Sequence, residues 1–125
     1  MDETIKNVVV RVIHIASDFY HVEKSEYTLL NESGYFELYN KVTESDIKKL
    51  LKKYPQLIAD WLRYSGDSLS SFRWNFIRCD DGKYLVGHWP GGKDFGEIST
   101  ADEFYACSAY IKRHIESTRI LFPLL

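Results

Sequence analysis

Apolar and polar residues alternate from residue 72 to residue 77, and this period of two predicts a β-strand. Asp80-Asp81-Gly82 follows as a turn signal, because Asp-Gly supplies the positive φ values that a tight hairpin requires. A second apolar run then returns the chain from residue 83 to residue 89. We therefore predict an antiparallel hairpin of residues 72–79 and 83–89, whose core-facing rings are Phe72, Trp74 and Phe76.

The turn also predicts which residues pair across the hairpin. If Asp81-Gly82 is a two-residue loop, Phe76 pairs with Gly87 and Trp74 with Trp89. A shift of one residue would move every side chain to the opposite face, so this register is a specific prediction. After the break at residues 90–92, residues 95–98 are predicted to add a third short strand.

The N-terminal segment, residues 5–22, fits either a helix or a strand. Its apolar residues recur at three- and four-residue spacings, as on one helical face, but the run Val8-Val9-Val10 is β-branched and favours a strand. We predict a helix over residues 4–23, because the pattern persists for more than ten residues without Gly or Pro. Residues 23–34 are polar and are predicted to form a connection, with a short extended piece at residues 27–30.

Two short helices are predicted in the middle of the chain. Thr43 is a good N-cap for the first, and its apolar stripe predicts burial of Ile47, Leu50, Leu51 and Tyr54. The second follows Pro55, ends near residues 65–67 and buries Leu57, Ile58, Trp61 and Leu62.

A longer C-terminal helix is predicted from the capping box that Thr100 and Glu103 would form. Its expected core face consists of Phe104, Cys107, Ser108, Ile111 and Ile115. Together these elements predict one α+β domain over residues 1–125, with several short helices and this longer helix packed on a small antiparallel sheet.

Composition restricts the classes of function. The formal net charge of −2 argues against a main role in nucleic-acid binding, which usually requires a basic patch. The two cysteines, Cys79 and Cys107, are too few for a disulfide framework. The apolar run of residues 8–16 contains Arg11 and His14, so it fits neither a signal peptide nor a membrane span. We therefore expect a cytoplasmic protein that has no membrane partner.

The sequence contains no catalytic or metal-binding motif. None of the four histidines forms an H-E-x-x-H pair or lies at zinc-ligand spacing from a cysteine, so we expect no metal and no cofactor. Cys107 and His114 would lie about 10 Å apart along one helix, too far for a nucleophile and its base. The prediction is a protein that is not an enzyme. The alternative is a small enzyme or ligand-binding domain, with Tyr84, His88 and Cys107 in a pocket between the hairpin and the C-terminal helix.

Acidic and aromatic residues are concentrated around the hairpin and the loop that follows it. Carboxylates beside exposed rings suit a partner with a basic cleft, because charge speeds association and buried rings supply binding energy. The candidate partner-binding residues are Asp67, Asp80, Asp81, Tyr84, His88, Trp89, Asp94, Phe95 and Glu97.

Three segments also resemble a known class of proteins. They are L-I-x-D-W-L at residues 57–62, the R-W-N-F strand answered by Y-L-V-G, and A-C-x-x-Y-I-x-x-H-I-E at residues 106–116. In size and layout the chain is similar to the small cytosolic immunity proteins encoded beside bacterial polymorphic toxins, including contact-dependent growth inhibition systems. The resemblance implies a protein that binds and neutralises one cognate toxin domain, commonly a nuclease. It identifies no binding residues. A homo-oligomer formed through the apolar tail, residues 120–125, remains a further alternative.

Overall fold

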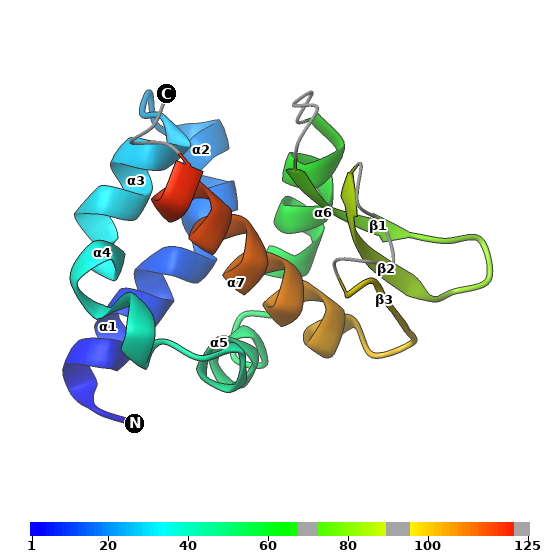
Figure 1. Cartoon of the computed structure of the whole chain (residues 1–125), viewed down its shortest axis with the longest axis horizontal. Helices are drawn as coiled ribbons and strands as arrows, with labels where there is room; N and C mark the ends of the chain where they lie inside the picture. Colours follow the sequence, from blue (N-terminus) through cyan, green and yellow to red (C-terminus); the bar gives the residue numbers. More distant parts are fainter. Residues whose placement is uncertain (68–72, 90–95, 122–125) are drawn as a thin grey trace.

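The computed structural model describes residues 1–67, 73–89 and 96–121 and has an α+β fold, as predicted (Figure 1). Phe72, Asp94, Phe95 and residues 122–125 of the tail lie outside these ranges. The elements are α1 (Glu3–Ile13), α2 (Ile15–His21), α3 (Glu26–Ser33), α4 (Tyr35–Leu38), the 3₁₀ helix η1 (Tyr39–Lys41), α5 (Glu44–Leu51), α6 (Leu57–Asp67), β1 (Arg73–Arg78), β2 (Tyr84–Trp89), β3 (Ile98–Thr100) and α7 (Glu103–Leu121).

The N-terminal segment is helical, which confirms the helix prediction over the strand alternative. The side chain of Asp2 caps α1 by accepting hydrogen bonds from the backbone N–H groups of Thr4 and Ile5. The segment forms two helices rather than one, because the chain departs from regular helical geometry at His14 (φ −87°, ψ −3°). This break lets α2 pack against α3 and α6, while α1 packs against α5.

The predicted connection at residues 23–34 is wrong, and so is its extended piece at residues 27–30. This segment is mostly α3, which Ser25 caps by accepting a hydrogen bond from the N–H of Thr28. Gly34 ends the helix in the left-handed region (φ 88°), the conformation that glycine adopts at a helix C-terminus. Only Leu30 and Ser33 of α3 are buried, so the apolar periodicity that would reveal a helix is missing.

Local sequence signals predicted the start of α5 correctly and that of α7 only approximately. Thr43 and Asp46 form a reciprocal capping box at α5. The predicted Thr100 cap of α7 is wrong: Asp102 accepts the hydrogen bonds from Phe104 and Tyr105 instead. Thr100 belongs to β3, which lies slightly later than the predicted third strand.

The hairpin forms where it was predicted, but its register differs by one residue. Phe76 pairs with Val86 and Trp74 with His88, rather than with Gly87 and Trp89. The reason is a longer turn than the two residues that the Asp-Gly signal predicts: the last strand pair is Arg78 with Tyr84, and Gly82 (φ 84°) donates a hydrogen bond to the carbonyl of Cys79.

One side of the sheet packs against α6 and α7, and the hairpin projects beyond the helices (Figure 1). The buried ring of Phe76 stacks on Tyr110 of α7, with centroids 5.6 Å apart. Ser65, at the end of α6, binds β1 twice: its hydroxyl accepts from the N–H of Phe76 (2.8 Å), and its carbonyl accepts from the guanidinium of Arg73 (2.7 Å). The edge strand β1 is therefore fastened to α6.

Trp61 joins the helical layers at the centre of the core. Its side chain is fully buried, its ring meets those of Tyr64 and Tyr110 edge to face, and its indole N–H donates to the carbonyl of Ile13 (2.9 Å). The indole thus satisfies a backbone carbonyl at the end of α1, where helical carbonyls lack partners within the helix.

Replacing Trp61 with Phe tests this role. The substitution leaves a void and removes the only donor described for the Ile13 carbonyl, so the free energy of unfolding in urea should fall by about 2 to 3 kcal/mol. The matched control is Trp89→Phe, whose ring is 63% exposed and should change stability by less than about 0.5 kcal/mol. Equal losses in the two variants would contradict this assignment.

Candidate protein-binding site

The side of the sheet that faces away from α6 and α7 is the candidate site. Strand alternation directs Phe76, Tyr84 and Val86 into the core, where all three are buried. The intervening residues face outward, and two of them are large and apolar: Ile77 is 44% exposed and Trp89 63% exposed. No described helix packs on this outer side, so the side chains of Ile77 and Trp89 are exposed to solvent.

A hollow of about 310 Å³ opens on the outer side of the sheet, around Gly87. A Cβ atom placed on Gly87 would meet the carboxylate of Glu97 at 3.4 Å, so the absence of a side chain at Gly87 lets the Glu97 side chain lie over β2. The lining residues are Asn75, Ile77, Leu85, Gly87, His88, Trp89 and Glu97.

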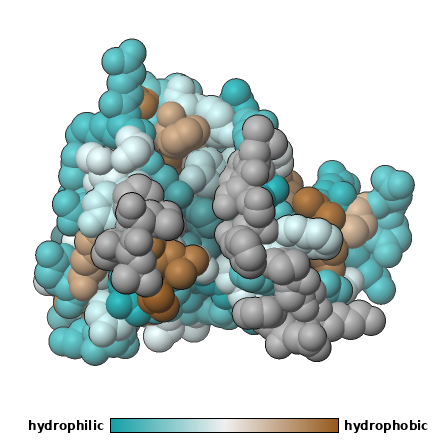
Figure 2. All heavy atoms as spheres, turned by 45° about the horizontal axis from the view of Figure 1, so that its top comes forward, coloured by the Kyte–Doolittle hydropathy of each residue, from teal (hydrophilic) through white to brown (hydrophobic). Residues whose placement is uncertain are grey.

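Only some of the predicted site residues share this surface. Trp89 and Glu97 line the hollow and are exposed, and Asp80 and Asp81 are exposed at the hairpin tip. Arg78 and Lys83 are exposed beside those two aspartates, so the charges of the tip balance. In Figure 2 hydrophobic surface lies beside the hydrophilic, projecting end of the molecule.

The structure places the other predicted residues elsewhere. Tyr84 is buried, and its hydroxyl donates to Glu103 of α7 (3.2 Å). His88 also lines the hollow, but its half-buried ring lies on the helix-facing side, 5.1 Å from that of Trp74. Asp67 accepts a 2.6 Å hydrogen bond from the hydroxyl of Tyr20 and belongs to a separate pocket of about 140 Å³. Burial and this hydrogen bond raise the pKa of Tyr20 to about 12.

The pocket required by the enzymatic alternative is not formed by its three residues. Cys107 is fully buried in α7, and burial raises the pKa of its thiol well above the usual range. None of the described pockets brings Tyr84, His88 and Cys107 together. Within the described ranges, no three His, Cys, Asp or Glu side chains are grouped to hold a metal ion, and no helix is long and apolar enough to cross a bilayer.

A partly buried polar cluster that the sequence did not predict joins α3, α6 and α7. One carboxylate oxygen of Glu26 accepts from the hydroxyl of Tyr64 (2.6 Å), and the other lies 2.6 Å from Nε2 of His114 and 3.1 Å from the Thr118 hydroxyl. The ring of His114 stacks on that of Tyr110, with an interplanar angle of 13°. Burial alone would raise the pKa of Glu26, but the charge and hydrogen bond of His114 and the two hydroxyl donors lower it overall.

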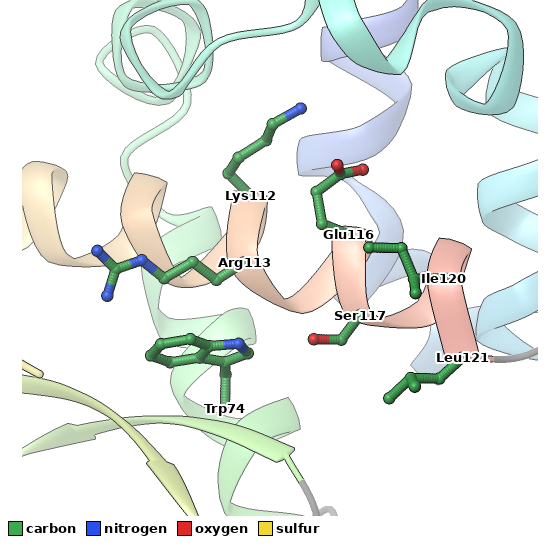
Figure 3. A pocket seen from close by; sticks show the side chains of 7 residues that line it. All are labelled: Trp74, Lys112, Arg113, Glu116, Ser117, Ile120 and Leu121. Atoms are coloured by element: carbon green, nitrogen blue, oxygen red, sulfur yellow. The ribbon is translucent and has the colours of Figure 1, made fainter. Parts of the chain in front are cut away.

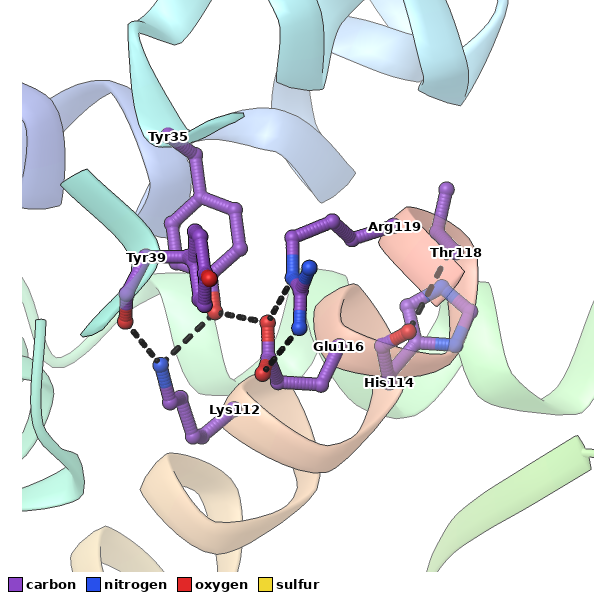
Figure 4. A network of polar contacts seen from close by, with 7 residues as sticks. All are labelled: Tyr35, Tyr39, Lys112, His114, Glu116, Thr118 and Arg119. Atoms are coloured by element: carbon purple, nitrogen blue, oxygen red, sulfur yellow. Dashed lines mark hydrogen bonds and ion pairs between the residues drawn. The ribbon is translucent and has the colours of Figure 1, made fainter. Parts of the chain in front are cut away.

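A second polar network ties α4 and η1 to α7 (Figure 4). The hydroxyl of Tyr35 donates to Glu116 (2.6 Å) and accepts from the ammonium of Lys112 (2.7 Å), which also donates to the carbonyl of Tyr39. Arg119 donates two hydrogen bonds to Glu116 and lies over the ring of Tyr39. Burial and the contact with Glu116 raise the pKa of Tyr35. These groups satisfy one another, which is the pattern of a structural network.

The largest described pocket, about 370 Å³, lies along the outer side of α7 (Figure 3). The guanidinium of Arg113 lies over the ring of Trp74, 4.8 Å from its centroid, and donates to the carbonyl of Gly96. Lys112 and Glu116 are engaged in the network above. The remaining lining is Ser117 and the exposed Ile120 and Leu121. Its charged groups already have partners within the chain, so the pocket offers a ligand mainly apolar contacts.

Comparisons with family models, curated proteins and solved structures found no match for this chain. The resemblance to immunity proteins therefore stays a prediction.

Thiol reactivity tests the burial that excludes Cys107 as an accessible nucleophile. Cys79 is half-buried near the hairpin tip, and it should react with Ellman's reagent in the native protein. Cys107 should react only after unfolding, so native protein should release about one equivalent of thiolate and denatured protein about two. In Cys79→Ser the fast reaction should vanish. Rapid labelling of native Cys79→Ser would show that Cys107 is accessible and would contradict its burial.

The Glu26 cluster predicts a specific dependence of stability on pH. The folded-state pKa of Glu26 lies below its ordinary value of 4.5, so its contribution is fully present above that value and is lost as the pH falls through the folded pKa. We expect Glu26→Gln to lower the free energy of unfolding by about 2 kcal/mol at pH 7 and by clearly less at pH 3. Glu32→Gln, which alters an exposed pair with Lys24 on the same helix, is the control. A Glu26→Gln effect that is equally large at both pH values would refute the assignment.

Proposed function

We propose that this protein is an immunity protein: it binds and neutralises a cognate bacterial toxin domain, of which a basic nuclease is the best candidate. The observation that carries the proposal is the outer side of the sheet, where Trp89 and Ile77 are exposed around the Gly87 hollow. The outward-facing residues that line this hollow form the outer sheet surface: Asn75, Ile77, Leu85, Gly87, Trp89 and Glu97.

The exposure of Trp89 favours a binding role over a purely structural one. A tryptophan buries more apolar area than most side chains when it is covered, and it is enriched among residues that dominate protein–protein binding energy. Core packing does not explain the position, since the core-facing side of β2 is already filled by Tyr84 and Val86. Leu85 and Ile77 pair directly across the strands and extend the apolar surface beyond the ring.

Fewer unbalanced acidic residues lie on this side of the sheet than the sequence suggested. Because the aspartates of the hairpin tip are accompanied by Arg78 and Lys83, the tip supplies little net field. Glu97 is the one described carboxylate that lines the outer sheet surface, and it stands beside the apolar residues. A partner that is basic opposite Glu97 and apolar around it matches this arrangement.

The test is co-expression with the toxin domain encoded beside the gene, followed by calorimetry on the purified pair. We expect a one-to-one complex with sub-micromolar affinity and loss of toxin activity in the complex. Trp89→Ala should weaken binding by about 2 kcal/mol or more, and Ile77→Ala by about 1 kcal/mol, because both remove area that the partner covers.

Ile120→Ala is the matched control for Ile77→Ala. Both isoleucines are about half exposed, but Ile120 lies on α7 and lines the pocket along that helix, not the Gly87 hollow. Binding that survives Trp89→Ala and Ile77→Ala but is lost in Ile120→Ala would place the interface on α7 and contradict the outer sheet surface. Failure of the two proteins to bind would end the immunity proposal itself.

A further inference from the structure

The Gly87 hollow has polar groups at both ends and apolar walls between them. Asn75 pairs with Gly87 across β1 and β2, and Glu97 immediately precedes Ile98, which pairs with the neighbouring Val86. Asn75, Gly87 and Glu97 therefore form one row across the outer side of the sheet. The amide of Asn75 stands on one side of the row, and the carboxylate of Glu97 lies over Gly87, which has no side chain of its own.

The walls of the hollow come from the rows on either side. Ile77 and Leu85 form one wall as a directly paired apolar couple, and Trp89 forms the other. The space is open on the solvent side, so an entering group need not displace any described element. Its dimensions, about 310 Å³, suit one long side chain rather than a drug-sized molecule enclosed on all sides.

The carboxylate of Glu97 is available for a ligand. None of the ion pairs between described residues involves Glu97, and Glu97 is exposed to solvent. The basic residue nearest along β1 is Arg73, whose guanidinium donates to the carbonyl of Ser65. A cation supplied from outside would thus meet the carboxylate without competition from that arginine.

We propose that the Gly87 hollow binds an arginine side chain of the partner protein, with the guanidinium between the ring of Trp89 and the carboxylate of Glu97. A guanidinium is planar, stacks on tryptophan, and donates two parallel hydrogen bonds to a carboxylate. Its remaining N–H groups reach the side-chain oxygen of Asn75 across the row. The inference deepens the proposed function and rests on it, because it names the group by which a basic partner is recognised.

Arginine fits this site better than lysine. An ammonium is a compact, strongly hydrated charge that neither stacks on a ring nor binds both carboxylate oxygens at once. The arginine stem would also lie along Ile77 and Leu85, where its methylene groups exclude water from the ion pair.

A second copy of this chain does not suit the same surface. In a two-fold symmetric dimer the same patch faces itself, so each Glu97 would meet the other copy's outer sheet surface. The hollow's described lining contains no lysine or arginine to neutralise that carboxylate. A heterologous partner that supplies the cation avoids an unpaired buried charge.

The hollow can be tested without the toxin by titrating the ¹⁵N-labelled full chain with Nα-acetyl-arginine N-methylamide. We expect saturable shifts of the Gly87 amide and the Trp89 indole N–H in the millimolar range, and shifts at least fivefold smaller with the uncharged citrulline analogue. Glu97→Gln should abolish the difference between the two probes, whereas Asp81→Asn at the hairpin tip should preserve it. Equal shifts with both probes, or unchanged binding to Glu97→Gln, would overturn the inference.

The toxin complex supplies the second arm of the test. Glu97→Gln should raise the dissociation constant at least tenfold, and Gly87→Val should do the same because the valine side chain would displace the carboxylate of Glu97 from its place over β2. The structure leaves ordinary contact distance for a Cβ at Gly87, and the residue lies in a strand, so the variant should fold. Ser45→Val, at an exposed position on α5 away from the sheet, is the control and should leave binding unchanged.

The failures of the two proposals give different results. If Trp89→Ala weakens the complex but Glu97→Gln and Gly87→Val do not, the outer sheet surface binds the toxin and the arginine inference is wrong. If no toxin binds, the proposed function fails, while the arginine and citrulline probes still decide whether the hollow recognises a guanidinium.

Discussion

One stretch of α7 is buried on every side, and the arrangement of the other elements follows from the need to cover it. Residues 106–111 are all buried, although a helix that covers a single core normally exposes about half of its surface. The sheet and α6 contact this stretch from one direction and α5 from another. Small side chains, Ala106, Ser108 and Ala109, allow close approach, while Tyr110 fills the space beneath Phe76. The hairpin is held in place by the same helix that closes the helical layer.

The sequence correctly predicted the elements that local sequence signals specify. Alternation predicted the strands, the Thr43 N-cap predicted α5, and the turn residues predicted the hairpin. Prediction failed where contacts between residues far apart in the sequence determine the local structure. Helix α3 lacks an apolar stripe, and part of its contact with the rest of the protein is polar: Glu26 binds His114 and Thr118, about ninety positions later in the chain. The register failed because the Asp-Gly signal specifies a turn but not how many residues flank it.

The candidate site was only partly predictable. Trp89 and Glu97 were identified from the association of rings and carboxylates, and both line the hollow. Tyr84 and His88 belong to the same strand, but the pleat directs their side chains to the helices. Gly87 was not recognised as a site residue, since under the predicted register it paired with Phe76 rather than Asn75. Which residues line the hollow depends on how the strands pair, so these residues can be identified only from the correct register.

The double attachment of β1 to Ser65 has a consequence for aggregation. An unpaired edge strand offers its backbone as a template on which another chain can add, and short helical proteins with one small sheet are exposed to this hazard. Here the N–H of Phe76, which would otherwise point outward from the edge, is bonded to a buried hydroxyl of α6. At this position the edge of β1 no longer offers a backbone donor to an added strand, and the outer sheet surface offers a partner side chains instead. Recognition by side chains alone can diverge by point mutation on the outer sheet surface while the core beneath it stays the same.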